Sequence, residues 1–179
     1  MKNHKTLNNF KKNMQMHIAK INLIFLLPFF TFIVGNALYA STVSKSEFLE
    51  IRGFWGSACF LVKVADTPSK RAKGLMHIDH MPKDQGMLFV YPEPMDVSFW
   101  MKNTKIPLDM LFLNSAGRVE YIHSNAKPQD RTIINGGKEI QYVVEINGGL
   151  SEKLGISIGS FGHHWMISKE PILSCTFNE

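Results

Sequence analysis

The chain has 179 residues, which is enough for one domain and a short additional segment, since a single hydrophobic core commonly takes about 100 to 150 residues. It carries 20 basic and 15 acidic residues, and five of the lysines stand before Asn22, where there is no acidic residue. Residues 22–179 therefore have a formal net charge of zero. The pI near 9.2 is thus a property of the N-terminal segment, and we expect no nucleic-acid partner for the remaining chain.

Residues 1–40 have the organisation of a secretory signal peptide. A basic region at 1–20 is followed by an apolar region at 21–34, and small residues allow cleavage after Ala37 or Ala40. The apolar region is shorter than the roughly 20 residues that span a bilayer, so an uncleaved inner-membrane anchor is the alternative. We expect a periplasmic or secreted protein that meets a membrane only through an uncleaved N-terminal segment.

The two cysteines, Cys59 and Cys175, stand near opposite ends of the exported part. An even number of cysteines in an oxidising compartment predicts a disulfide. Two separate buried thiols that act as small apolar side chains are the alternative, because the sequence does not place the two Cα atoms within bridging distance.

The first half of the exported part predicts strands and one short helix. Residues 41–56 are expected to form a linker with a short strand at 48–51, and 57–65 form a strand with two largely apolar faces. Thr67 is a suitable helix N-cap, Pro68 suits the first helical position, and Gly74 ends the helix. A strand over 86–91, a turn at 92–94 and a strand over 97–101 follow.

The second half continues the alternation of strands and turns. We expect a hairpin of strands 108–113 and 119–124 around the turn at 114–117, a polar loop at 127–139, and a strand over 140–146. A short helix at 150–155 and a closing strand at 161–168 precede a tail at 169–179. The chain thus predicts a mostly β, compact antiparallel barrel or sandwich, with one or two short helices in a single β domain at 57–168.

The sequence resembles the family called domain of unknown function 192 over about residues 58 to 160. The matching segments are Thr67-Pro68, 71–76 (RAKGLM), 86–90 (GMLFV), 98–104 (SFWMKNT), 106–109 (IPLD) and 142–145 (YVVE) before Gly148-Gly149. The resemblance implies a compact, mostly antiparallel β domain that is often exported, and it implies no reaction. Lys70 departs from the family pattern, which usually has an acidic residue in the first helical turn.

The segment from Trp100 to Asp109 carries the candidate ligand-binding side chains. In an extended chain Val97, Phe99 and Met101 share one face and Ser98 and Trp100 the other, so one face is free for a role besides packing. An indole can stack on a ligand while polar side chains hold it. The candidate ligand-binding residues are Trp100, Lys102, Asn103, Thr104 and Asp109. Alternatively, Trp100 is a core residue and its polar neighbours bond the turn.

A second group of side chains predicts copper binding as an alternative. Met76, His77, His80 and Met81 offer thioether and imidazole ligands, which hold copper outside the cytosol. We expect no other cofactor.

The sequence contains none of the common catalytic motifs. It has no His-Glu-x-x-His, Gly-x-Ser-x-Gly, phosphate loop, Gly-x-Gly-x-x-Gly or Cys-x-x-Cys pattern. The sequence therefore favours non-catalytic binding of a small ligand or a protein partner, and an uncatalogued hydrolase is a further alternative.

Overall fold

The computed structural model describes residues 47–168 together with Cys175. The predicted signal peptide at 1–40 lies outside the described residues, as does the tail at 169–179 apart from Cys175. Within the described part of the chain, no helix is long and apolar enough to cross a membrane.

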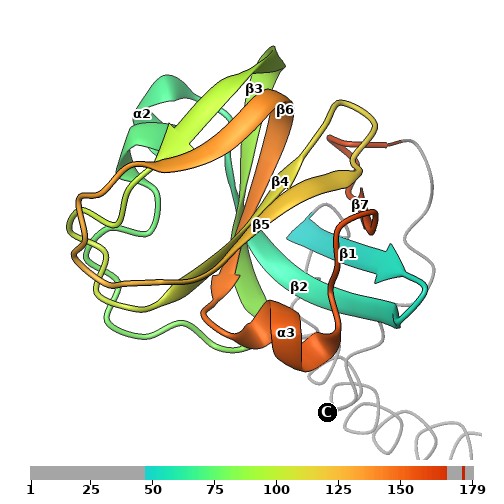
Figure 1. Ribbon diagram of the computed structural model, residues 1–179, viewed down its shortest axis with the longest axis horizontal. Helices are drawn as coiled ribbons and strands as arrows, with labels where there is room; N and C mark the ends of the chain where they lie inside the picture. Colours follow the sequence, from blue (N-terminus) through green and yellow to red (C-terminus); the bar gives the residue numbers. More distant parts are fainter. Residues whose placement is uncertain (1–46, 169–174, 176–179) are drawn as a thin grey trace, which may run out of the picture. The chain divides into compact units, whose positions relative to one another are not determined.

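Seven strands form one sheet in the order β5-β4-β6-β3-β2-β1-β7 (Figure 1). This confirms the predicted mostly β fold with two short helices. All neighbouring strands are antiparallel except β2 and β3, which are parallel. The elements are β1 (Phe48–Gly53), β2 (Gly56–Ala65), α2 (Pro68–Lys73), β3 (Gln85–Phe99), β4 (Leu108–Leu113), β5 (Val119–Ala126), β6 (Ile134–Asn147), α3 (Leu150–Leu154) and β7 (Phe161–His163).

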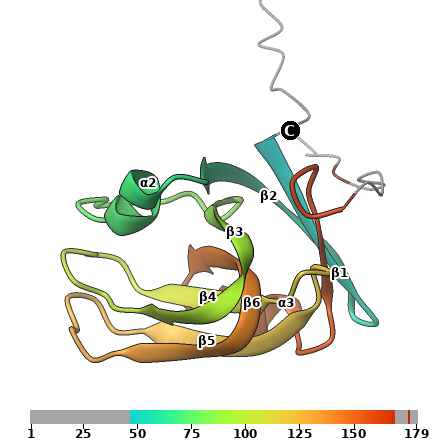
Figure 2. The ribbon, with the colours of Figure 1, turned by 90° about the horizontal axis from the view of Figure 1, so that it is seen from above.

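The sheet curls so strongly that its two edge strands approach each other at one end. Arg118, just before β5, forms an isolated bridge with Phe161 of β7. Backbone hydrogen bonds from Val119 N to Ser160 O and from Gly162 N to Gly117 O, both 2.8 Å long, join the same two segments. The result is a half-barrel, whose curvature is visible in Figure 2.

Both faces of the central strands are buried, because apolar side chains alternate between two hydrophobic clusters. On β4, Met110 and Phe112 belong to the first cluster, and Leu111 and Leu113 belong to the second. On β6, Val143 faces the first cluster. Its neighbours Tyr142 and Val144 face the second. The side of the sheet on which a side chain lies therefore alternates from residue to residue along β4, and along β6 from Tyr142 to Ile146.

The predicted turn at 92–94 is wrong, because β3 runs through it without ending. Two features let the strand accommodate Pro92 and Pro94. The pairing of β3 with β6 shifts register between Val90 and Met95, and the pairing of β3 with β2 ends at Phe89. A proline is tolerated where its missing N–H has no ladder partner.

The predicted loop at 127–139 is too long, since β6 already begins at Ile134. Gly136, one of the two glycines that suggested a loop, has a packing role instead. A Cβ on Gly136 would collide with the ring of Phe112 and come within 2.8 Å of Val97. Gly136 therefore lets β6 pass close to the core rather than ending the strand.

The closing strand is shorter than predicted. β7 covers only Phe161–His163, because the chain turns immediately afterwards. The backbone N–H groups of Ile167 and Ser168 both donate to the carbonyl of His164, which is a turn and not a ladder. Conversely, β1 continues two residues beyond the predicted short strand at 48–51 and joins the sheet.

Candidate functional site

A cleft of about 540 Å³ lies between α2 with its following turn and the uncovered part of β3. Its size is within the range of small-molecule sites, roughly 300–1,000 Å³. Pro68 and residues 71–76 form one wall, and Phe89, Tyr91 and 98–100 form another. Glu145, which β6 contributes, also lines the cleft.

Local sequence signals and one arginine position α2 over β3. The Thr67 side chain accepts a hydrogen bond from Lys70 N, and Gly74 ends the helix with a φ of 47° that favours glycine. Arg71 Nη1 donates to the carbonyl oxygens of Asp66 (2.9 Å) and Val90 (2.8 Å). Arg71 thereby ties the helix wall to the strand wall.

Aromatic rings form much of the cleft surface. Phe89 and Phe99 meet edge to face with their centroids 5.1 Å apart. The Arg71 guanidinium lies 4.9 Å from the centroid of Tyr91, and Lys102 Nζ lies 5.3 Å from that of Trp100. Trp100 remains 49% exposed, so it offers a ring to a ligand and is not a core residue.

Glu145 is the buried acid of the cleft. The residue is 4% exposed, and its Oε2 atom has no hydrogen-bond partner among the described residues. Its cross-strand neighbours are Met87 on β3 and Met110 on β4. Burial raises the pKa of Glu145 to about 8, so the carboxyl is mostly neutral at pH 7. Burial also raises the pKa of the Tyr91 phenol above its ordinary value, although the charge of Arg71 acts in the opposite direction.

The structure brings four of the five candidate ligand-binding residues to the cleft or its border. Trp100 and Thr104 line it, and Lys102 lies against the Trp100 ring. Asn103 Nδ2 contacts the sulfur of Met76, another lining residue, at 3.9 Å. The hydroxyl group of Thr104 already forms one hydrogen bond within the turn, because its Oγ1 donates to Lys102 O.

Asp109 lies on the other face of the sheet. It pairs with Ile146 in the β4–β6 ladder, whereas Glu145 pairs with the next residue, Met110, so the two carboxyl groups point to opposite sides. Oδ1 accepts from Asn125 N and Gly149 N, and Oδ2 accepts from the backbone N and the Oγ of Ser151. Asp109 thus joins β4 to the ends of β5 and β6 and to α3, and it is not part of the cleft.

The candidate copper ligands have different surroundings. Met76 lines the cleft, Met81 is 7% exposed in the first hydrophobic cluster, and His77 and His80 are exposed. Over 47–168 and Cys175, no three His, Cys, Asp or Glu side chains gather as a metal site would require.

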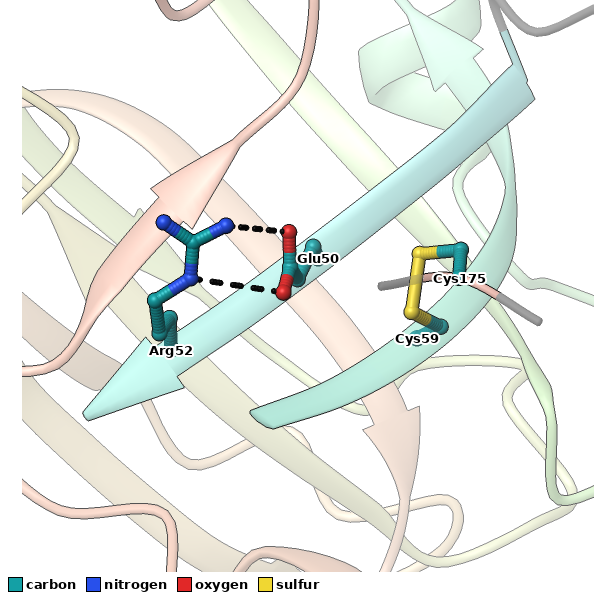
Figure 3. Close-up of a disulfide and its surroundings, with 4 residues drawn as sticks. All are labelled: Glu50, Arg52, Cys59 and Cys175. Carbon is teal, nitrogen blue, oxygen red and sulfur yellow. Dashed lines mark hydrogen bonds and ion pairs between the residues drawn. A yellow bond between two sulfur atoms is a disulfide. The ribbon is translucent and has the colours of Figure 1, made fainter. Parts of the chain in front are cut away.

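The disulfide joins Cys59 of β2 to Cys175, so that the chain beyond β7 is bonded to the sheet (Figure 3). Cys59 is opposite Glu50 in the β1–β2 ladder. Arg52 Nη2 donates to the buried Glu50 carboxylate at 2.7 Å on the same strand. This part of the sheet is stabilised covalently and by a partly buried ion pair.

Sequence reasoning missed Arg71, Tyr91 and Glu145 as site residues. Arg71 and Glu145 stand in the segments that carry the family resemblance, where no role was assigned to them. The signal for Glu145 was a carboxyl group within a mostly apolar strand segment. In the structure the segment from Ile140 to Ile146 is largely buried. A charge in such a strand is unusual unless it is paired or functional.

The model of the DUF192 family, described as Uncharacterized ACR, matches residues 52–161. The chain belongs to the DUF192 family. The match covers every strand except the first residues of β1 and the last residues of β7, and it includes all the cleft residues. A search of curated proteins gave no match.

Two solved structures are similar to this DUF192 chain. A protein of unknown function from Novosphingobium aromaticivorans DSM 12444 is 37% identical, with a TM-score of 0.64 over 65% of this chain and 83% of that one. A protein from Sinorhizobium meliloti 1021, described as a "putative transcription regulator", is 39% identical, with a TM-score of 0.66 over 67% of this chain and 94% of that one.

Replacing Asp109 by Asn should destabilise the domain without altering the cleft. The amide nitrogen of the introduced asparagine cannot accept the bonds that one carboxylate oxygen now accepts, and we expect a loss of about 3 kcal/mol in the free energy of unfolding. Urea unfolding checks this value. Asp79→Asn is the control, because its exposed ion pair with Lys105 contributes about 0–1 kcal/mol. Equal stability of D109N and wild type would contradict the structural role.

Replacing Glu145 by Gln should remove a pH dependence of stability. With a pKa near 8 in the folded chain and 4.5 as the ordinary value, folded Glu145 keeps a proton that the unfolded chain has lost between these pH values. The free energy of unfolding therefore falls by about 1.4 kcal/mol per pH unit as the pH rises through this window, and it levels off above the folded pKa.

E145Q lacks this slope. Its stability relative to wild type should rise by about 3 kcal/mol between pH 5 and pH 7.5, as measured by urea unfolding at both pH values. Glu93→Gln, an exposed change on β3, is the matched control and should show no such difference. Parallel stability profiles for E145Q and wild type would contradict the burial of a neutral carboxyl.

Proposed function

We propose that this chain is an exported, non-catalytic domain that binds a small molecule in the cleft between α2 and β3. The observation that carries the proposal is the Glu145 carboxyl, which is buried, lines the cleft, and has an Oε2 atom without a partner among the described residues. A buried polar atom without a hydrogen bond costs about 1–3 kcal/mol. A ligand that bonds Glu145 would recover that free energy.

The cleft combines this polar anchor with apolar walls. Phe89, Phe99 and the half-exposed Trp100 supply rings on which a ligand body can pack. Pockets with a few polar groups among apolar and aromatic walls are the usual form of small-molecule sites. The proposal keeps Trp100 as the predicted stacking residue and replaces Asp109 by Glu145 as the acidic group.

The side chains of the cleft favour binding over hydrolysis. Its lining includes the hydroxyl groups of Ser98 and Thr104, but it includes no histidine and no second carboxyl group beside Glu145. A hydroxyl nucleophile needs an adjacent general base to be activated. A mostly neutral Glu145 is a poor general base at pH 7.

Export is supported by the N-terminal sequence and the disulfide together. Disulfides persist in the periplasm and outside the cell and are rare in a reducing cytosol. The bond between Cys59 and Cys175 therefore agrees with the signal-peptide features of residues 1–40. The balanced charge of residues 22–179 gives no support for carrying the description of the S. meliloti protein as a transcription regulator over to this chain.

Ligand binding should depend on Trp100. The probes are 3-phenylpropanoate, 3-phenylpropanamide and 3-phenylpropylamine, which share one apolar body and differ in charge. In titrations followed by nuclear magnetic resonance of the backbone amides, we expect at least one probe to shift residues around the cleft in a saturable manner. Trp100→Ala should weaken that probe about tenfold, because a stacking aromatic ring is worth about 1.4 kcal/mol or more.

Trp165→Ala is the control for loss of an exposed tryptophan, since Trp165 is 62% exposed and does not line the cleft. It should leave the affinity unchanged. Failure of all three probes to shift the cleft residues would overturn the proposed function.

The exported protein should contain an oxidised cysteine pair and lack its signal peptide. Mass spectrometry of protein purified from the periplasm should give a mass that begins after Ala37 or Ala40. Alkylation should add no group before reduction and two groups after it, at Cys59 and Cys175. A chain that begins at Met1, or two alkyl groups without reduction, would contradict export in this form.

A further inference from the structure

The cleft is lined by more basic than acidic side chains. Arg71 and Lys73 line it from α2 and its C-terminal end, and Glu145 is its single acidic residue. Tyr91 faces the cleft from β3 as a neutral phenol, and the neighbours of Glu145 on β3 and β4 are Met87 and Met110. With Glu145 protonated, the cleft presents two cations and no anion.

Arg71 and Lys73 form no ion pair within the part of the chain that the structure describes. Arg71 uses Nη1 to bond two backbone carbonyl groups and packs on the Tyr91 ring, and neither partner carries a charge. The nearby Asp66 carboxylate forms its ion pair with Lys70. No carboxylate of the described residues lies within ion-pair distance of Arg71 or Lys73.

The protonation of Glu145 complements this excess of positive charge. A protonated carboxyl can donate a hydrogen bond, whereas an ionised one only accepts. An anionic oxygen of a ligand can therefore receive the Glu145 proton in a hydrogen bond while Arg71 and Lys73 attract its charge. An ammonium group in the same place would be repelled by both cations.

We propose that the ligand of this cleft is a small organic anion, a carboxylate with an apolar, ring-bearing body, which packs on Trp100 and presents its charged oxygens to Arg71, Lys73 and the Glu145 carboxyl. This proposal rests on the proposed function, because it names the class of ligand for the same cleft. The apolar walls hold the body and the cationic side chains select the charge.

The three phenylpropyl probes separate charge from apolar packing. At about pH 6.5, 3-phenylpropanoate should bind the exported protein at least about tenfold more tightly than 3-phenylpropylamine, with the neutral amide between them. Binding of the propanoate should weaken as the pH rises through the pKa of Glu145, because the ionised carboxyl repels the anion. E145Q should bind it with little change over the same pH range.

Lys73→Gln provides the sharpest variant, because Lys73 is exposed and has no ion-pair partner among the described residues. It should weaken propanoate binding about fivefold and amide binding much less. Lys70→Gln, on the same helix but outside the cleft lining, is the matched control and should change neither.

Tighter binding of the amine, or equal binding of all three probes, would overturn the anion preference and leave the proposed binding function intact. An unchanged propanoate affinity in K73Q would overturn it as well. Absence of binding by all three probes would overturn both proposals.

Discussion

The arrangement of this domain depends on β6, which pairs with β3 along one side and with β4 along the other. From Tyr142 to Ile146 its side chains alternate between the two sides of the sheet, and both faces of this part of the strand are buried. An ionisable residue on such a strand must either be fully bonded or stay neutral, because an isolated charge in an apolar interior is too costly. Burial on β6 keeps the Glu145 carboxyl mostly neutral at pH 7, and this carboxyl lines the cleft.

Two carboxyl groups near the centre of the domain, those of Asp109 and Glu145, are both buried but differ in their hydrogen bonds. This difference separates a structural role from a candidate binding role. Asp109 accepts four hydrogen bonds, which account for both of its oxygens and fix β4 to three neighbouring segments. Glu145 has an oxygen with no partner among the described residues, and ionising it in place costs on the order of 5 kcal/mol more than ionising the same group in water. Buried acids with strongly raised pKa values cluster at functional sites, since a fold gains no stability by keeping one.

Local signals in the sequence predicted those parts of the fold that local chemistry decides. The N-cap Thr67 and the terminal Gly74 defined α2, and the turn at 114–117 defined its hairpin. Pro92 and Gly136 led to the wrong turn at 92–94 and the overlong loop at 127–139. Whether such residues interrupt a strand depends on the ladder partners and side chains that they meet across the sheet. The alternation of faces predicted Trp100, which lines the cleft, whereas the burial of Glu145 depends on the sheet around it, which no local pattern contains.

The cleft itself follows from the single parallel pair of the sheet. Parallel neighbours cannot be joined by a tight turn, so the chain needs a crossover between the end of β2 and the start of β3, and that crossover contains α2. Because β2 ends at Ala65, β3 has no partner on that side beyond Phe89, and α2 lies beside it there (Figure 1). At this edge the Val90 carbonyl accepts a hydrogen bond from the Arg71 side chain of the helix, where a neighbouring strand would otherwise donate. A sheet built only of antiparallel hairpins would pair that edge with a strand and leave no wall opposite Tyr91 and Trp100.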